Sequence, residues 1–245
     1  PTFHGTLVSA DYAKKHPEIV VAFLRAAIEA DRLVTAEPEK YSELIQKVAG
    51  GDAEVAYLYH GPLGLQTRDF TWKPEYRQAL QTSIDTLKLL KKTDRNIDIK
   101  DFIDDSYLLE AFRQSGLDYQ KSLNNYGKSP LLAKDAVTGK AITDFSRVAQ
   151  VWVKGEPKVR SYENPENALD DVRKLKAAGK EIRVVYVLDS SSHIKLLAKL
   201  AWYTTDAKGQ LHAFLQKGNA TQFAQANNAR VFDFTQVQSQ TIQIS

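Results

Sequence analysis

Apolar residues recur with two different periodicities along the chain. Up to about residue 127 they follow helical spacing, and one such stripe consists of Val20, Phe23, Leu24, Ala27 and Ile28. From about residue 142, short apolar strands alternate with helical stretches. The intervening residues are mostly polar or turn-forming. We therefore predict a helical domain at 1–127, a linker at 128–141 and a second domain at 142–245.

Proline, glycine and short polar residues predict where the helices of the first region begin and end. After a strand-like stretch at 3–8, Ser9 can cap a short helix at 11–15. Prolines occupy first-turn positions in three further helices. The helices that we expect begin at Pro17, Glu37-Pro38, Asp52, Pro74 and Ser106, and the last of them ends near Gln114.

The second region predicts one strand–strand–helix–strand unit used twice. The first unit comprises strands at 148–153, 158–162 and 182–188, with a helix from Pro165; the second comprises strands at 200–204, 210–215 and 229–234, with a helix at 219–226. The predicted fold class is therefore α+β, a helical part followed by a small domain of duplicated ββαβ units.

Composition and charge narrow the possible partners. The chain has 33 Lys and Arg against 30 Asp and Glu, a formal net charge of +3, with both signs interspersed. There is no basic stripe of the kind that neutralises a phosphate backbone, so we expect no nucleic-acid partner. The apolar runs fall far below the ~20 residues that span a bilayer, so any membrane association would be peripheral.

The sequence contains no motif of a known catalytic site. It lacks a Gly-x-Ser-x-Gly elbow, a phosphate loop, a His-Glu-x-x-His zinc motif and a dinucleotide glycine pattern. Adjacent acids such as Asp104-Asp105 point about 100° apart on a helix, which favours ordinary surface or capping charges. We therefore expect no enzyme and assign no catalytic residue.

The first region resembles the carboxy-terminal helical part of periplasmic ABC-transporter solute-binding proteins of the sulfonate, nitrate and taurine type. The resemblance lies in the stretches Tyr12–Val20, Ala22–Ala26, Ala30–Arg32, Glu37–Glu39 and Asp101–Leu108. It implies a small anionic solute, a membrane permease as partner and a periplasmic location. Nothing in the sequence corresponds to the amino-terminal part that builds both lobes in that family. We therefore expect a chain that lacks its amino-terminal portion, with the binding function residing in the longer parent.

Five residues are candidates for ligand binding under this resemblance. His4 and Thr6 lie on a strand that the resemblance places near the hinge; the alternative is a hinge strand with a partly buried histidine. Tyr59 and His60 precede a sharp break and could line a site, or simply end a helix. Trp72 could stack on a ligand, although an aromatic residue before a helix is usually a packing anchor.

The second region resembles the end of the NosL-like family, accessory proteins of nitrous oxide reductase maturation. The residues concerned are Ala201–Asp206, Phe214–Leu215, Asn219–Ala224 and Ala229–Phe234. The resemblance implies copper delivery, and Cu(I) prefers thiolate, thioether and imidazole ligands. Because the sequence has no Cys and no Met, only His193 and His212 remain as metal candidates there. We expect no cofactor and leave copper open, the alternative for His193 being a solvated polar turn.

Three classes of function follow from these patterns. The leading prediction is the substrate-binding component of an ABC importer for a small anionic solute, with an appended accessory domain. The alternative is a periplasmic metal-handling or accessory protein that acts through its carboxy-terminal domain. The third is a structural interaction module in which the helical part serves as a docking platform.

Overall fold

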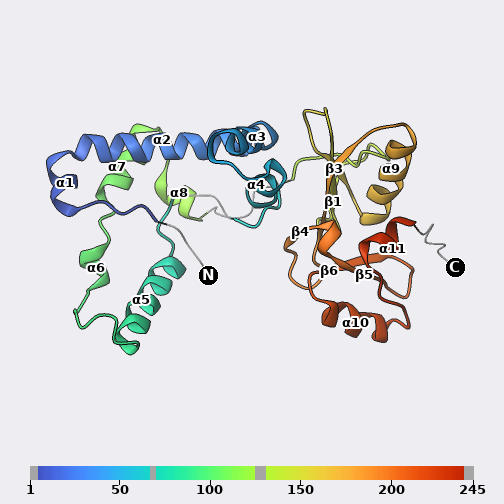
Figure 1. Cartoon of the computed structure of the whole chain (residues 1–245). Helices are drawn as coiled ribbons and strands as arrows, with labels where there is room; N and C mark the ends of the chain where they lie inside the picture. Colours follow the sequence, from blue (N-terminus) through green and yellow to red (C-terminus); the bar gives the residue numbers. More distant parts are fainter. Residues whose placement is uncertain (1–4, 67–69, 125–130, 240–245) are drawn as a thin grey trace. The chain divides into compact units, whose positions relative to one another are not determined.

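The computed structural model describes residues 5–66, 70–124 and 131–239 and divides the chain into two compact units (Figure 1). The first unit comprises Pro1–Leu33 and Arg68–Gly127, and the second comprises Val34–Thr67 and Lys128–Ser245. The secondary structure is mixed, which confirms the predicted α+β class. The domain boundaries drawn from the sequence stay a prediction. In the described part of the chain, no helix is long and apolar enough to cross a membrane.

The first unit is built from helices around a small apolar core. The core consists of Val21, Ile28, Leu108, Ala111 and Phe112, with Trp72 and Tyr119 against it. The predicted helix starts at Pro17, Pro74 and Ser106 are confirmed. The helices of the first unit are α1 (Ala10–Lys15), α2 (Pro17–Ala36), α5 (Pro74–Leu89), α6 (Ile99–Phe102), α7 (Ser106–Gln114) and α8 (Tyr119–Asn124). The last residues of α2, from Val34, are assigned to the second unit.

The strand predicted at 3–8 is wrong where the structure describes it. Phe3 and His4 lie outside the described residues, and Gly5 to Ser9 form no strand. A strand needs a neighbour for its backbone N–H and C=O groups, and the described residues of this unit contain only helices and loops. Ser9 does cap α1, because its hydroxyl accepts a hydrogen bond from Tyr12 N at 3.2 Å.

The described residues of the second unit form a helical hairpin, two antiparallel sheets and three further α-helices. The larger sheet has the order β2-β1-β3-β4, and β5 pairs with β6 in the smaller one. The elements are α3 (Pro38–Ala49), α4 (Ala53–His60), β1 (Ala149–Val153), β2 (Arg160–Tyr162), α9 (Pro165–Ala177), β3 (Ile182–Leu188), β4 (Lys195–Leu197), the 3-10 turn η1 (Ala198–Leu200), β5 (Trp202–Thr205), β6 (Leu211–Phe214), α10 (Lys217–Ala226) and α11 (Phe234–Ser239).

The predicted duplication is visible in the strand pairing. In the first ββαβ unit, β1 pairs antiparallel with both β2 and β3. In the second, β5 pairs with β6 on one side and meets Phe232 on the other through an antiparallel bridge at Tyr203. The predicted strand at 229–234 is nevertheless wrong, since only that bridge forms. Asp233 and Gln236 exchange capping hydrogen bonds of 2.8 and 2.9 Å, which turn the chain into α11.

The two faces of the larger sheet have different chemistry. Its aliphatic face, with Val151 and Val185, packs against α9. The opposite face carries Trp152 and Tyr186, which pack against Tyr57 and its neighbours on α4. Figure 1 shows α4 and α9 on opposite sides of β1 and β3. The α3–α4 hairpin therefore belongs to the core of this unit, although almost ninety residues of sequence separate it from the first strand.

A buried lysine stands where the hairpin meets the sheet. Lys195 on β4 is 2% exposed, and its ammonium group donates a hydrogen bond of 2.9 Å to the carbonyl oxygen of Pro62. The same nitrogen lies 4.2 Å from the ring centre of Tyr57 and 4.9 Å from that of Tyr186. Aromatic faces attract cations, so these rings replace part of the lost hydration. Burial lowers the pKa of Lys195 well below its ordinary value of 10.5, and Glu39 opposes that shift.

Ion pairs also join the hairpin to β3 and to the turn before β2. Arg183 contacts Glu54 at 2.6 Å and Glu43 at 2.8 Å, and its guanidinium group lies 4.2 Å from the Trp152 ring centre. The 8%-exposed side chain of Glu39 contacts Lys158 at 3.1 Å. Charged groups on partly buried positions need such partners, so the polar contacts fix one orientation of the hairpin.

We predict that Lys195 makes the free energy of unfolding depend on pH in the alkaline range. The folded-state pKa of Lys195 lies below the unfolded value of 10.5. At pH values between these two pKa values, the unfolded chain therefore binds one proton more than the folded chain. The free energy of unfolding should therefore rise with pH by up to about 1.4 kcal/mol per pH unit, until tyrosines of the unfolded chain titrate near about 10. Urea unfolding at several pH values measures this slope.

The variant Lys195→Met should lose that part of the slope, whereas Lys199→Met, which removes an exposed lysine, should retain it. An equal slope in the native protein and in Lys195→Met would contradict the assignment.

Candidate functional site

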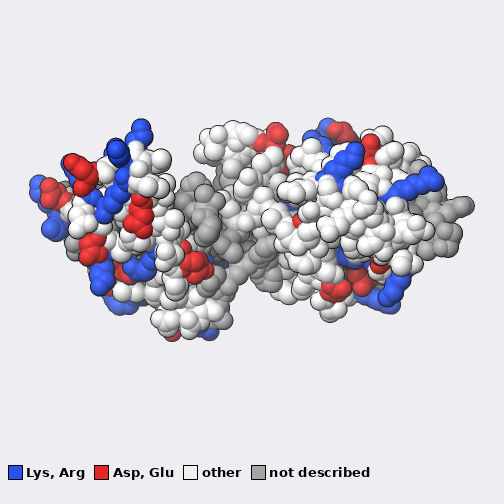
Figure 2. Space-filling model, turned by 90° about the horizontal axis from the view of Figure 1, so that it is seen from below, with Lys and Arg blue, Asp and Glu red and all other residues white. Residues whose placement is uncertain are grey.

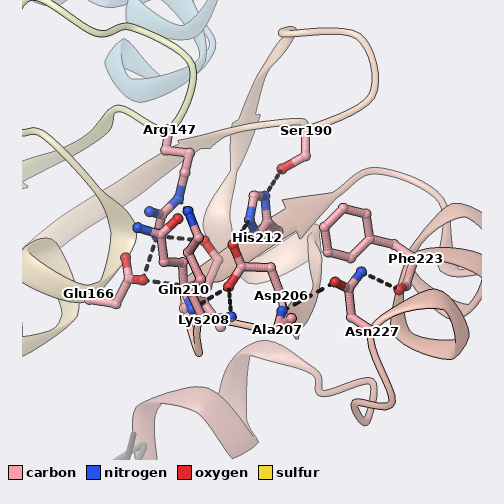
Figure 3. A network of polar contacts seen from close by, with 11 residues as sticks. Arg147, Glu166, Ser190, Asp206, Ala207, Lys208, Gln210, His212, Phe223 and Asn227 are labelled. Carbon is pink, nitrogen blue, oxygen red and sulfur yellow. Dashed lines mark hydrogen bonds and ion pairs between the residues drawn. The ribbon is translucent and has the colours of Figure 1, made fainter.

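His212 is the best-positioned candidate of the sequence analysis. It lies on β6, where Ser190 Oγ is 3.2 Å from its Nδ1 atom and Asp206 Oδ2 is 3.5 Å from its Nε2 atom (Figure 3). The ring of Phe223, on α10, covers it with a centroid distance of 4.8 Å. The imidazole is thus held between a hydroxyl and a carboxylate and backed by an aromatic ring.

Asp206 is fixed by the turn between β5 and β6. Its Oδ1 atom accepts hydrogen bonds from Lys208 N at 2.9 Å and Gln210 N at 2.8 Å. Burial acts to raise the pKa of this carboxyl, but these two N–H groups and His212 outweigh it, so the pKa is lowered. Asp206 therefore faces His212 as a carboxylate.

Ser190 is held by the turn that follows β3. Its N–H donates to Ala213 O at 2.8 Å, which joins this turn to β6. The preceding residue, Asp189, is 3% exposed and accepts hydrogen bonds from Ser192 N and Leu215 N, each at 2.9 Å. A buried carboxyl group that accepts several N–H hydrogen bonds orders the loop around it.

An ion pair fixes the other end of β6. Arg147 pairs with Glu166, and Glu166 also accepts a hydrogen bond of 2.6 Å from Leu211 N. Arg147 donates to Leu211 O at 3.0 Å. Burial and the charge of Arg147 lower the pKa of His212 from 6.5, against the opposing effect of Asp206 and Glu166. The surroundings of His212 therefore favour the neutral imidazole over the imidazolium.

A shallow depression lies beside this histidine. It has a volume of about 380 Å³ and shares Phe223 with the covering ring of His212. Its lining combines aromatic rings, amides and a hydroxyl, and none of the lining side chains is charged. The lining residues are Ser191, Phe214, Asn219, Gln222, Phe223 and Ala226.

The order hydroxyl, imidazole, carboxylate also occurs in serine hydrolases, where it activates the hydroxyl group. Here the separation of 3.5 Å between His212 and Asp206 exceeds the about 2.6–3.2 Å over which such a relay is aligned. The arrangement suits a fixed hydrogen-bonding imidazole better than a nucleophile with its base.

The candidate ligand-binding residues of the sequence analysis are distributed over both units. His4 lies outside the described residues, and Thr6 is exposed. Tyr59, 40% exposed, and His60 end α4 in the second unit, with ring centroids 6.2 Å apart. Trp72 packs in the core of the first unit, and its backbone N–H donates a hydrogen bond of 2.9 Å to Tyr119 Oη. Their roles in binding stay predictions.

The two metal candidates have separate surroundings. His193 is exposed, has a φ of 55° and donates its backbone N–H to Asp189 O at 2.7 Å. His193 interacts electrostatically with Asp144, whereas His212 contacts Ser190 and Asp206. Within the described ranges, no group of three or more His, Asp or Glu side chains could hold a metal ion.

The sequence did not reveal the residues around His212. Ser190 lies in the turn that follows β3, and Asp206 lies in the turn between β5 and β6. Nothing in their spacing connects them to His212. The signal that was available is positional, since each of the two residues lies in a turn just after a strand.

The comparisons with known proteins give a likeness to solved structures but none to a protein family. No protein-family model matches the chain, and no curated protein matches it. Among solved structures, the chain is similar to the copper chaperone NosL from Shewanella denitrificans, with 19% identity and a TM-score of 0.38 over 43% of this chain and 90% of that one. A likeness of this degree carries no argument about function. The resemblance of the first region to solute-binding proteins has no support from these comparisons and stays a prediction.

The residues around His212 do not fit Cu(I). Its neighbours Ser190 and Asp206 offer oxygen atoms, which are hard ligands, and the sequence supplies neither Cys nor Met. Cu(I) prefers soft sulfur and imidazole donors. A single imidazole among oxygen donors leaves that preference unmet.

We predict that His212 titrates below 6.5, because burial and Arg147 disfavour its charged form. The stability that the neutral imidazole contributes is present above 6.5 and is lost as pH falls through the lowered pKa. The ring-proton NMR signal of His212 measures the titration midpoint. Asp206→Asn should lower this midpoint further, since the carboxylate favours the imidazolium.

The matched control is Asp233→Asn, at a helix-capping position where Asn substitutes well. An unchanged or higher midpoint in Asp206→Asn would show that the carboxylate does not act on His212.

Proposed function

We propose that this chain is a non-catalytic binding component, in which the second unit acts as an accessory domain that holds a small polar solute beside His212. The observation that carries the proposal is the solvent-open depression formed by α10, β6 and Ser191, whose Phe223 ring also covers His212.

The chemistry of the lining supports reversible binding. Asn219 and Gln222 offer amide donors and acceptors, and Phe214 and Phe223 offer flat apolar surface. Binding sites commonly combine apolar walls with a few polar groups that orient the ligand. On the same helix, Lys217 lies 4.4 Å from the ring centre of Trp202 and brings a positive charge to the first turn of α10. That charge favours a solute with an anionic group.

The same proposal includes a periplasmic location and a permease of an ABC importer as partner. Both rest on the resemblance of the first region to solute-binding proteins. Copper handling through His193 and His212 is not part of the proposal, because the donor set around His212 does not fit Cu(I).

Titration calorimetry with nitrate, taurine and a short alkyl sulfonate tests the proposal. We expect saturable binding of at least one solute, and about three- to tenfold weaker binding by Gln222→Leu, which removes one lining amide and with it one hydrogen bond. His193→Asn should bind as the native protein does, since Asn tolerates the left-handed backbone at that position. Absence of binding by the native protein, or equal weakening in both variants, would contradict the proposal.

A further inference from the structure

The carboxy-terminal end of α5 exposes three leucines and three lysines within six consecutive residues. We name Leu87, Lys88, Leu89, Leu90, Lys91 and Lys92 the Leu/Lys tip. Its three leucines are 45%, 82% and 59% exposed, and all three lysines are exposed. The apolar stripe of α5 is buried at Ile84, which is 5% exposed, and it continues beyond the point where the unit covers it. Leu87 therefore extends the face that Ile84 uses for packing, whereas Leu89 and Leu90 add exposed apolar surface elsewhere on the same helix end.

The helix ends in a turn that normally favours glycine. Lys92 N donates to Leu87 O at 2.9 Å and Lys91 N donates to Lys88 O at 2.9 Å, while Lys91 has a φ of 52°. This pattern is a Schellman turn, and its left-handed position is usually Gly or Asn. A lysine there costs conformational energy and adds a charge. A local rule broken in this way often marks a functional position.

The tip lies at the far end of the first unit. Figure 1 shows α5 running away from α2 and α7, with its carboxy-terminal end on the outside of that unit. No residue of the tip belongs to a described core cluster. The tip is therefore free to meet a flat surface without a change in the fold of the unit.

The tip has a local excess of positive charge. On the face shown in Figure 2, Lys and Arg side chains lie among Asp and Glu side chains. The stretch from Thr86 to Thr93 contains three lysines and no acidic residue. Asp94 and Arg95 follow it and offset each other. The positive end of α5 thus complements an anionic surface, which the leucines alone would not select.

We propose that the Leu/Lys tip binds an anionic phospholipid surface, with the leucines in the interfacial layer and the lysines on the phosphate groups. The helix dipole explains a basic residue in the last turn of α5, but it gives no reason for three exposed leucines. An interfacial helix combines these two features: apolar side chains enter the boundary of the acyl chains, and cations remain at the headgroups. The proposal is independent of the solute site beside His212.

Co-sedimentation of the full chain with lipid vesicles tests the proposal. We expect binding to vesicles of equal parts phosphatidylcholine and phosphatidylglycerol at low salt, much weaker binding at high salt, and little binding to phosphatidylcholine alone. Replacing a lysine near such a surface lowers the partition coefficient roughly fivefold. Lys91→Gln with Lys92→Gln should therefore lower it about twenty-fivefold.

Two further variants separate the roles within the tip. Leu89→Ser should weaken binding at every salt concentration and leave its salt dependence unchanged, because it removes apolar area only. Lys91→Gly should raise the melting temperature, since glycine suits the turn, and yet weaken binding roughly fivefold. A structural role of Lys91 alone would change the melting temperature without changing vesicle binding.

The matched controls lie in the second unit. Lys174→Gln with Lys176→Gln removes two exposed lysines from the last turn of α9, and Leu132→Ser replaces a leucine that is 94% exposed. Both should bind vesicles as the native protein does. Equal binding to neutral and anionic vesicles, or losses in the controls as large as in the tip variants, would overturn the proposal. Binding to polyglutamate without binding to anionic vesicles would also overturn it, in favour of an acidic protein partner.

Discussion

The ammonium group of Lys195 lies between the sheet and the α3–α4 hairpin, where water does not reach it. Its hydrogen bond to Pro62 O and the rings of Tyr57 and Tyr186 replace its hydration, and two of these three partners come from the hairpin segment. The chain reaches this geometry by a tight reversal after α4: a Cβ atom on Gly64 would meet Tyr59 O at 2.5 Å. Glycine is therefore required there. Without the hairpin, Lys195 would simply be solvated, so the burial of this charge and the position of the hairpin are one constraint.

This constraint determines what the other parts of the second unit can do. With α3 and α4 on one face of the larger sheet and α9 on the other, β1 and β3 are covered on both sides. Because both faces of β1 and β3 are covered, a ligand can reach polar residues only beyond the strand ends. The turns that carry Ser190 and Asp206 lie there. The buried carboxylate of Asp189 and the pair of Arg147 with Glu166 hold these turns against β6. The His212 site thus depends on the order that the covered sheet imposes.

Local signals predicted most of the elements, and long-range contacts explain the failures. Pro17, Pro74 and the apolar run Ile182–Leu188 carry their own helix and strand signals, and all three were predicted correctly. β4 was missed because Lys195 reads as a surface residue until Pro62, 133 positions away, supplies its partner. The strand predicted at 229–234 failed because capping by Asp233 starts α11. His212 could be selected as a candidate from its residue type. Its partners could not, since Ser190 and Asp206 reach it only through the fold.

Native-state hydrogen exchange tests the central claim that the hairpin and the sheet form one unit through Lys195. The slowest amides of α3 and α4 should open with the same free energy as those of β3, to within about 1 kcal/mol, because one cooperative unit opens as a whole. In Lys195→Ala both sets of amides should lose protection together. Hairpin amides that exchange at a far lower free energy, while β3 stays fully protected, would show that the hairpin opens by itself and would contradict the account.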